Sequence, residues 1–141
     1  MTKAKKTAAL KKTIKDLEPV FARLKQILDS YKQGWVTKGD PKRYTYLETA
    51  STTFRGKPLW FGGVRMGKNY VSFYLMAVYA CPELLKGMSP ALKKRMQGKA
   101  CFNFATVDEE LMGELEKLTA AGAARFQSEK FLQQLAASSF K

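Results

Sequence analysis

The sequence predicts an α+β domain, with an antiparallel sheet of about four to five strands covered on one face by N- and C-terminal helices, and short helices inserted before the last strand. Three observations lead to this prediction. Residues 57–80 alternate as a long β-hairpin, apolar residues recur at helical spacing near both ends, and one isolated strand pattern follows at residues 101–104. Because only that strand stands between helices, a repeating βαβ chain is excluded.

The first helix is predicted over residues 16–32, because apolar residues recur at the helical period through this segment. Asp16 is the predicted N-cap, since Pro19 then falls in the first turn, where its missing amide proton costs no hydrogen bond. Residues 1–15 hold six lysines and no acid, and we expect them to form a basic N-terminal arm. The rest, residues 16–141, is assigned to a single domain.

The central hairpin is predicted over residues 57–80, with a tight turn at residues 66–69. Its second strand divides into two sets of side chains on opposite faces. The first set is Val71, Phe73, Leu75 and Ala77, and the second is Tyr70, Ser72, Tyr74 and Met76. Upstream, residues 39–41 predict a loop, and residues 44–48 and 51–55, rich in Thr and Tyr, predict a strand or a pair of short strands.

Two short helices are predicted between the hairpin and the last strand. Residues 82–86 predict one helical turn, and Ser89 is predicted to cap a second short helix that has Pro90 at its first position and runs through Met96. Residues 101–104 then return to the alternation of a strand.

The C-terminal part of the chain predicts two further helices. Thr106 and Glu109 are spaced as a capping box, which opens a helix with a stripe of leucines. Gly122 would interrupt this helix, and residues 128–135 predict a last one.

The charge balance is strongly basic: 25 Lys and Arg stand against 12 Asp and Glu, a formal net charge of +13. Such a surface binds phosphate backbones or anionic surfaces, and it also serves solubility alone. No apolar run reaches the roughly 20 residues that span a bilayer, and the N-terminus lacks a secretory signal pattern. We therefore expect a cytoplasmic protein without membrane contact, in which Cys81 and Cys101 are reduced, packed thiols.

The residue types in this chain give little indication of an enzyme. Residues 62–68 match the spacing of a phosphate-binding loop, but Asn69 stands where Ser or Thr should bind magnesium, and a strand pattern follows in place of a helix. The chain has no histidine, which removes the commonest general base and imidazole metal ligands. The sequence therefore predicts a protein that is not an enzyme, with no catalytic residue, cofactor or metal site.

The candidate ligand-binding residues lie on the central hairpin: Trp60, Arg65, Tyr70 and Tyr74. No acid occurs from residue 49 to residue 82, so a face that presents these side chains would suit an anionic or aromatic small ligand, or stacked single-stranded bases. In the alternative interpretation, a second layer of short helices or another subunit buries the tyrosines.

A second basic patch is predicted at Lys93, Lys94, Arg95 and Lys99, on and after a short helix. Two interpretations stay open for it. It is either a solvated helix face or, together with the lysine arm, a surface for nucleic acid.

Three short segments follow one another in the chain: Phe-Arg-Gly-Lys-Pro-Leu at residues 54–59, Lys-Asn-Tyr-Val-Ser-Phe-Tyr at residues 68–74, and Gly-Lys-Ala-Cys-Phe-Asn-Phe at residues 98–104. Their order resembles that of the YdhG-like family of small bacterial domains of unknown function. The resemblance covers roughly residues 16–126. It implies a compact α+β domain likened to frataxin, and it links one branch of the family to intracellular iron delivery.

These observations lead to three functional hypotheses. The first is a non-enzymatic YdhG-like domain, monomer or homodimer, that binds an anionic small ligand or a protein partner through the hairpin. The second is a nucleic-acid-associated basic protein that uses the arm and the second patch. The third, which the resemblance implies, is a frataxin-like iron-binding protein, for which Asp108, Glu109 and Glu110 are the carboxylates to neutralise in a test.

Overall fold

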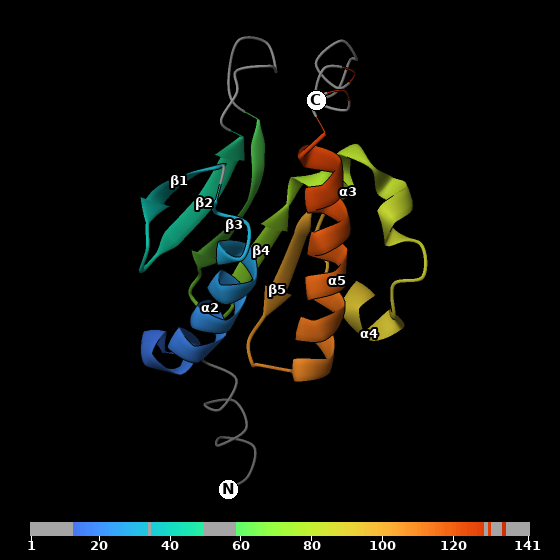
Figure 1. Ribbon diagram of the computed structural model, residues 1–141. Helices are drawn as coiled ribbons and strands as arrows, with labels where there is room; N and C mark the ends of the chain where they lie inside the picture. The colour runs from blue at the N-terminus through green and yellow to red at the C-terminus, as the bar shows by residue number, and fades with distance from the viewer. Residues whose placement is uncertain (1–12, 34, 50–58, 129, 131–133, 135–141) are drawn as a thin grey trace, which may run out of the picture.

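The computed structural model describes residues 13–33, 35–49, 59–128, 130 and 134 of the chain. Its described strands form one antiparallel sheet in the order β1-β2-β3-β4-β5, so each strand pairs with its neighbour in sequence (Figure 1). The strands are β1 (Trp35–Asp40), β2 (Tyr44–Thr49), β3 (Trp60–Met66), β4 (Val71–Leu75) and β5 (Cys101–Phe104). The helices are α2 (Ile14–Asp29), α3 (Met76–Ala80), the 3-10 helix η1 (Pro82–Leu85), α4 (Pro90–Lys93) and α5 (Glu109–Phe126). The predicted α+β fold, with short helices before the last strand, is confirmed.

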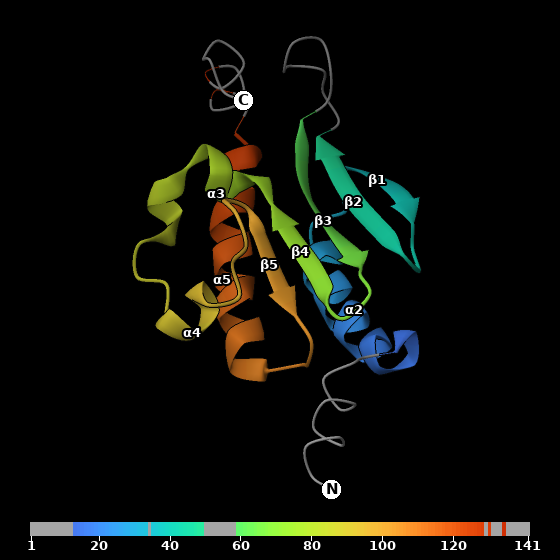
Figure 2. The same cartoon turned by 180° about the vertical axis from the view of Figure 1, so that it is seen from behind.

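The two long helices cover the same face of the sheet. Figure 1 shows α2 and α5 in front of the strands, with α3, η1 and α4 beside the β5 edge. Seen from behind, the strands lie in front, and no described helix lies over β2, β3 and β4 on that side (Figure 2). We call this uncovered side of the sheet the open face.

The hydrophobic core fills the space between the sheet and the two long helices. Its largest fully buried side chains are Phe61, Phe73, Phe102, Phe104, Phe126, Leu17, Leu24, Leu28, Leu47, Leu75, Leu92 and Met112. They come from both long helices, from β2 to β5 and, in the case of Leu92, from α4. Removing each such side chain from water contributes about 1.5–3 kcal/mol before entropic costs, so this core accounts for the cohesion of the two layers.

The first helix starts two residues earlier than the sequence predicts. Thr13 is the N-cap, its side chain accepting a hydrogen bond from the Asp16 amide while the Asp16 carboxylate accepts one from the Thr13 amide. Asp16 is therefore the third residue of a capping box and not the cap itself. Pro19 lies inside the helix, on its exposed side, so the predicted boundary between arm and domain at residues 15 and 16 falls within α2.

The strand predictions were right in the centre of the sheet and wrong at two places. The hairpin turn lies at residues 67–70, one residue later than predicted, and Val71, Phe73 and Leu75 face the core as expected. However, β4 ends at Leu75, and Ala77 belongs to α3. The predicted loop at residues 39–41 is also wrong in part, because Gly39 and Asp40 end an additional strand, β1, which is exposed along most of its length.

Three helix predictions near the C-terminus also need correction. The short helix after Ser89 ends at Lys93 and not at Met96, although Ser89 is its N-cap as predicted. The predicted capping box does not form, because Asp108 is the N-cap of α5 and accepts hydrogen bonds from the first amides of that helix. Gly122 is buried inside a continuous α5 and does not interrupt it.

Some predicted features lie outside the described residues. These are the arm at residues 1–12, the strand at residues 51–55, the turn at residues 56–58 and most of the helix at residues 128–135. The first helix, by contrast, is described to its end: it stops at Asp29, with Ser30 as its C-cap, and not at residue 32 as predicted. None of the helices in the described ranges combines the length and the apolar character that crossing a membrane requires.

Arg23 links the two long helices through ion pairs. Its guanidinium lies 3.0 Å from a carboxylate oxygen of Glu109 and 3.0 Å from one of Glu116. The hydrogen bond and charge of Arg23 hold the pKa of Glu109 below its ordinary value. A carboxyl group with a lowered pKa in the folded state adds stability above its unfolded pKa, about 4.3 for Glu, and loses that contribution as the pH falls through the folded value.

We therefore expect Arg23→Met to lower the thermal midpoint near neutral pH, and we expect the difference from the unmodified protein to shrink as the pH falls below about 4. Thermal unfolding of both proteins followed by circular dichroism across this pH range measures the effect. A difference that stays constant down to acidic pH would show that Arg23 acts through packing and not through its carboxylate partners.

Candidate ligand-binding face

Two rows of side chains cross the open face, and the strand register defines them. In one row Tyr44 stands opposite Arg65, which in turn stands opposite Ser72, and Ser72 stands opposite Asn103. In the next row the residues are Tyr46, Gly63, Tyr74 and Cys101. Directly opposed residues of paired strands present their side chains on the same face. Their neighbours along the strands, such as Thr45 and Phe73, are buried in the core on the other side.

A β-bulge in β3 places Trp60 on the open face. The register between β2 and β3 shifts between Leu47 and Glu48, so that Gly62 pairs with Leu47 and Trp60 pairs with Glu48, with Phe61 as the additional residue. Phe61 contacts Phe126 of α5, whereas the ring of Trp60 contacts the open-face tyrosines. The bulge thus directs one of these two adjacent aromatic residues to each side of the sheet.

Four aromatic rings form a continuous cluster across β2, β3 and β4. The ring centroids are 5.1 Å apart for Tyr44 and Tyr46, 6.5 Å for Tyr46 and Trp60, and 5.7 Å for Trp60 and Tyr74. We call these four residues the aromatic row. Tyr44 is 36% exposed and the other three are half-buried, so each ring is packed against a neighbour and still reaches solvent.

Gly63 forms the floor of the aromatic row. A Cβ atom at this position would lie 2.8 Å from the Cβ of Tyr46 and 3.3 Å from Cζ2 of Trp60. Only a residue without a side chain therefore lets the Trp60 ring lie so close to the strand. Among the described residues, Nε1 of Trp60 is buried without a hydrogen-bond partner, so ring contacts hold this indole in place.

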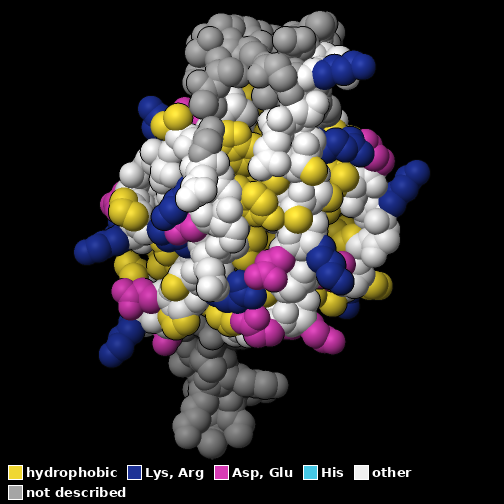
Figure 3. Space-filling model, in the orientation of Figure 1, with side chains coloured by type: hydrophobic (Ala, Val, Ile, Leu, Met, Phe, Trp, Pro, Cys, Tyr) yellow, Lys and Arg dark blue, Asp and Glu magenta, His cyan; other side chains and the backbone are white. Residues whose placement is uncertain are grey.

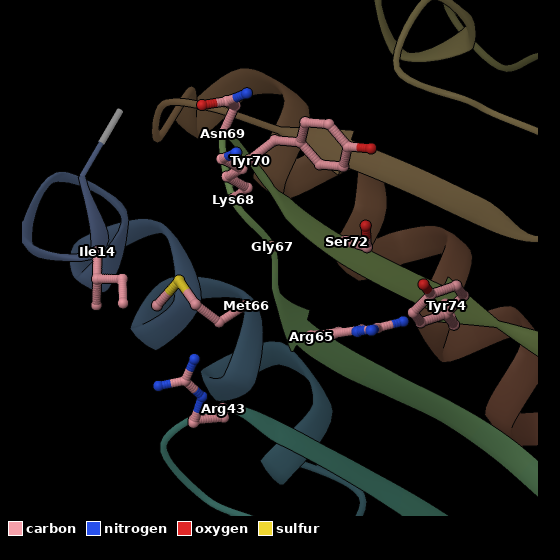
Figure 4. A pocket seen from close by; sticks show the side chains of 10 residues that line it. All are labelled: Ile14, Arg43, Arg65, Met66, Gly67, Lys68, Asn69, Tyr70, Ser72 and Tyr74. Atoms are coloured by element: carbon pink, nitrogen blue, oxygen red, sulfur yellow. The ribbon is translucent and has the colours of Figure 1, made fainter. Parts of the chain in front are cut away.

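A cavity of about 760 Å³ lies at the end of the hairpin, next to the aromatic row (Figure 4). Its lining comes from the open face, the hairpin turn, the turn before β2 and the start of α2. The lining residues are Ile14, Arg43, Arg65, Met66, Gly67, Lys68, Asn69, Tyr70, Ser72 and Tyr74. Three of them are cations and none is a carboxylate. We call this the hairpin cavity.

The cations of the hairpin cavity approach it from different segments. Figure 4 shows Arg65 extending from β3 toward the ring of Tyr74, while Arg43 comes from the turn between β1 and β2. The Arg43 carbonyl accepts a 2.7 Å hydrogen bond from the amide of Met66, which ties that turn to the hairpin end. Within the described ranges no carboxylate lies at ion-pair distance from Arg43, Arg65 or Lys68.

The helix-covered side has a different charge pattern. There, Lys and Arg side chains are interspersed with Asp and Glu over α2 and α5 (Figure 3). This mixture includes the pairs that Arg23 makes with Glu109 and Glu116. The hairpin cavity is therefore an acid-free basic site on a molecule whose other side balances its charges.

A polar network closes the β5 end of the open face. Ser72 donates a 2.7 Å hydrogen bond to Oδ1 of Asn103, and Nδ2 of Asn103 donates one of 2.7 Å to Gln97. The thiol of Cys101 lies 3.4 Å from the same Oδ1 atom. Burial raises the pKa of Cys101, and the hydrogen bonds from Ser72 and Tyr74 only partly oppose this, so the group stays a thiol at neutral pH.

Burial also raises the pKa of Tyr44, and nearby Tyr74 and Tyr46 add to this effect, while Arg65 opposes it. The Tyr44 hydroxyl therefore remains neutral around pH 7 and can donate as well as accept a hydrogen bond. It offers no negative charge that would repel an anion from Arg65.

The structure brings together three of the four predicted site residues. Trp60, Arg65 and Tyr74 share the open face, whereas Tyr70, 40% exposed, lies at the hairpin turn and borders the cavity without joining the aromatic row. The sequence left open an alternative in which short helices bury the tyrosines. In the structure, no described helix lies over β2, β3 and β4 on the open face (Figure 2).

Sequence reasoning missed Tyr44, Tyr46 and Arg43. The alternation of Tyr44, Tyr46 and Glu48 is a signal for a shared strand face. It could have placed the two tyrosines beside Trp60 only if the pairing of β2 with β3 had been known.

The second basic patch is exposed but its members do not converge. Lys94 and Arg95 border a smaller cavity of about 370 Å³ near the start of α5, which Asp108 also lines. Lys99 instead lies 5.8 Å from the ring centre of Tyr79, a cation–π contact. The patch is thus divided between two places on the surface.

The carboxylates considered for iron are engaged in helix capping and ion pairing. Asp108 caps α5, and Glu109 pairs with Arg23. In the described part of the chain no group of three or more Cys, Asp or Glu side chains is arranged to hold a metal ion. Cys81 and Cys101 are both free thiols, the first buried and the second half-buried, as predicted.

These features define a class of protein: a small α+β domain with an open, aromatic and basic sheet face. No protein-family model, curated protein or solved structure matches the chain. The functional argument therefore rests on the geometry of this face.

Proposed function

We propose that the chain is a cytoplasmic, non-enzymatic binding domain of the YdhG-like type, which holds an anionic ligand in the hairpin cavity. The observation that carries the proposal is the lining of this cavity by Arg43, Arg65 and Lys68 without any carboxylate. The segments at residues 68–74 and 98–104, which suggest the family, lie at the hairpin turn with β4 and on β5 with the loop before it.

Unpaired positive charges that lie close together cost free energy. Cations placed side by side repel one another, and on the helix side of this protein that repulsion is relieved by carboxylates. In the hairpin cavity an anion would give the same relief and would gain charge-assisted hydrogen bonds, each about twice as strong as a neutral one. Ser72 lines the same wall, but its hydroxyl proton is already donated to Asn103, so the cations are the donors available to the anion.

The size of the cavity fits a small molecule. Ligand-binding cavities typically enclose about 300–1,000 Å³, and the hairpin cavity has about 760 Å³. Its aromatic wall at Tyr74 would accept a ring or an apolar part of the ligand, while the cations hold its anionic group.

The test uses inorganic pyrophosphate as the probe, titrated calorimetrically into the full-length protein at about 50 mM salt, where screening is modest. We expect Arg65→Gln to weaken binding about tenfold, corresponding to the loss of one charge-assisted contact. The matched control is Arg95→Gln, which removes the same charge from another exposed position and should leave binding unchanged. Equal weakening by both variants, or no heat of binding at all, would overturn the proposal.

A further inference from the structure

We infer that the open face binds single-stranded nucleic acid, with a backbone phosphate in the hairpin cavity and bases stacked on the aromatic row. This inference rests on the proposed anion site and names its ligand class. It differs from binding through the lysine arm or the second basic patch, because it assigns the contacts to Tyr44, Tyr46, Trp60 and Tyr74 beside Arg65.

The aromatic row extends beyond the hairpin cavity. Tyr74 lines the hairpin cavity, but Trp60 and Tyr46 lie outside it, farther across the sheet. A small anion would leave those rings in water. A ligand that follows the row must therefore carry several flat groups in addition to its negative charge, which is the composition of a nucleotide chain.

The second step is the shape of the surface. Gly63 places bare backbone between Tyr46 and Tyr74, and the Trp60 ring lies against it. Neighbouring rings of the row are 5.1 to 6.5 Å apart and inclined to one another by 32° to 62°, and each of them still reaches solvent. Stacking a base on such a ring contributes about 1–3 kcal/mol and tolerates any base.

The third step is the distribution of charge. Arg65 stands beside Tyr44 in the strand register and extends toward Tyr74, so a cation borders the stacking surface directly (Figure 4). Two carboxylates stand beside the aromatic row: Glu48 pairs with Trp60 at the opposite end, and Asp40 of β1 pairs with Tyr44 and accepts a hydrogen bond from the Lys42 amide. Ile14, which lines the hairpin cavity, is joined through Thr13 to the lysine-rich residues 1–12.

The same geometry argues against a duplex as the ligand. In double-stranded DNA the flat surfaces of the bases are stacked on one another, and only their edges reach the grooves. Exposed aromatic rings stack on flat base surfaces and not on base edges, and single-strand-binding proteins combine such rings with a basic groove.

The experiment uses the two tryptophans as reporters on opposite sides of the sheet. Trp35 packs on Phe61 at the helix side, with ring centroids 4.5 Å apart, and Trp60 lies on the open face. In the full-length Trp35→Phe protein we expect octathymidylate to quench the remaining Trp60 fluorescence at about 50 mM salt. In the Trp60→Phe protein, which loses no hydrogen bond by the change, octathymidylate should leave the Trp35 signal unchanged.

The variants separate this inference from the proposed function. Tyr46→Leu should weaken octathymidylate binding about tenfold, the loss of one stacking contact, and should leave pyrophosphate binding unchanged, because Tyr46 lies outside the hairpin cavity. Tyr46→Phe keeps the ring and should retain the affinity, which excludes misfolding as the cause. Arg65→Gln should weaken both ligands.

The possible outcomes distinguish the inference about nucleic acid from the proposed anion site. Pyrophosphate binding without tighter binding of octathymidylate would overturn the inference and leave the anion site in place. If neither pyrophosphate nor octathymidylate binds, both the inference and the proposed function are wrong. Equal affinity for a duplex of the same length would also overturn the inference. Binding that depends on Lys93 and Lys94 but not on Tyr46 would overturn it and assign nucleic acid to the second basic patch.

Discussion

Phe61→Ala is expected to lower the free energy of unfolding by about 4 kcal/mol, within the range of about 3–5 kcal/mol that is typical for removing a buried phenyl ring. Phe61 has no exposed surface. Its ring centroid lies 4.5 Å from that of Trp35, 5.5 Å from that of Phe126 and 6.2 Å from that of Tyr31. The ring therefore joins β1, α5 and the end of α2 to the bulge in β3, and alanine would leave a cavity that all of these elements border.

Denaturant-induced unfolding followed by circular dichroism measures this loss. The matched control is Tyr70→Ala, which removes an aromatic ring that is 40% exposed at the hairpin turn and should change stability by no more than about 0.5 kcal/mol. A loss below about 2 kcal/mol for Phe61→Ala would mean that the surrounding rings collapse into the space and that Phe61 is not the packing centre described above.

The features of the site that could be predicted from the sequence are those that depend only on the alternation of side chains along a single strand. Alternation on a single strand puts Tyr74 on the face opposite Phe73, whatever the strand pairs with. Turn residues and glycines placed the hairpin end correctly, and with it Arg65 and Lys68 at the same end of the molecule.

The part that could not be predicted depends on pairing between strands. Strand β1 is exposed along most of its length, so it carries no alternating apolar signal, and its Gly39 and Asp40 are typical of a turn. Arg43 joins the hairpin cavity only because β1 and β2 form a second hairpin beside the first one. The bulge at Phe61 likewise becomes visible only when β2 is aligned with β3.

The change from strand to helix after Leu75 is a further case in which tertiary packing decided the local structure. Residues 76–80 continue an apolar run, and a short apolar run does not distinguish a buried strand from a buried helix. In the structure Ala77, at the start of α3, packs against Gly122 of α5. Two small residues that are far apart in sequence thus allow the close crossing, and neither one predicts it alone.

That crossing leads to the second prediction with a large effect: Gly122→Ala should destabilise the protein by about 1–2 kcal/mol. In a helix, alanine is ordinarily about 1 kcal/mol more favourable than glycine. Here a Cβ on Gly122 would lie 2.6 Å from the Cβ of Ala77, with Leu75 and Phe61 also within 4 Å. Ala77 is fully buried and its methyl group cannot rotate away, so the helices must move apart, and such overpacking costs about 1–3 kcal/mol.

The matched control is Gly113→Ala in the same helix, where an added Cβ would meet no atom within 4 Å. This change should stabilise the protein by up to about 1 kcal/mol, so the two glycines of α5 should respond with opposite signs. Ala77→Gly, introduced together with Gly122→Ala, should recover part of the loss, with a coupling of about 1 kcal/mol in a double-mutant cycle measured by denaturant unfolding. If Gly122→Ala stabilises as much as Gly113→Ala does, or if the cycle shows no coupling, α3 and α5 do not cross through these two residues, and the helical turn after Leu75 must have another cause.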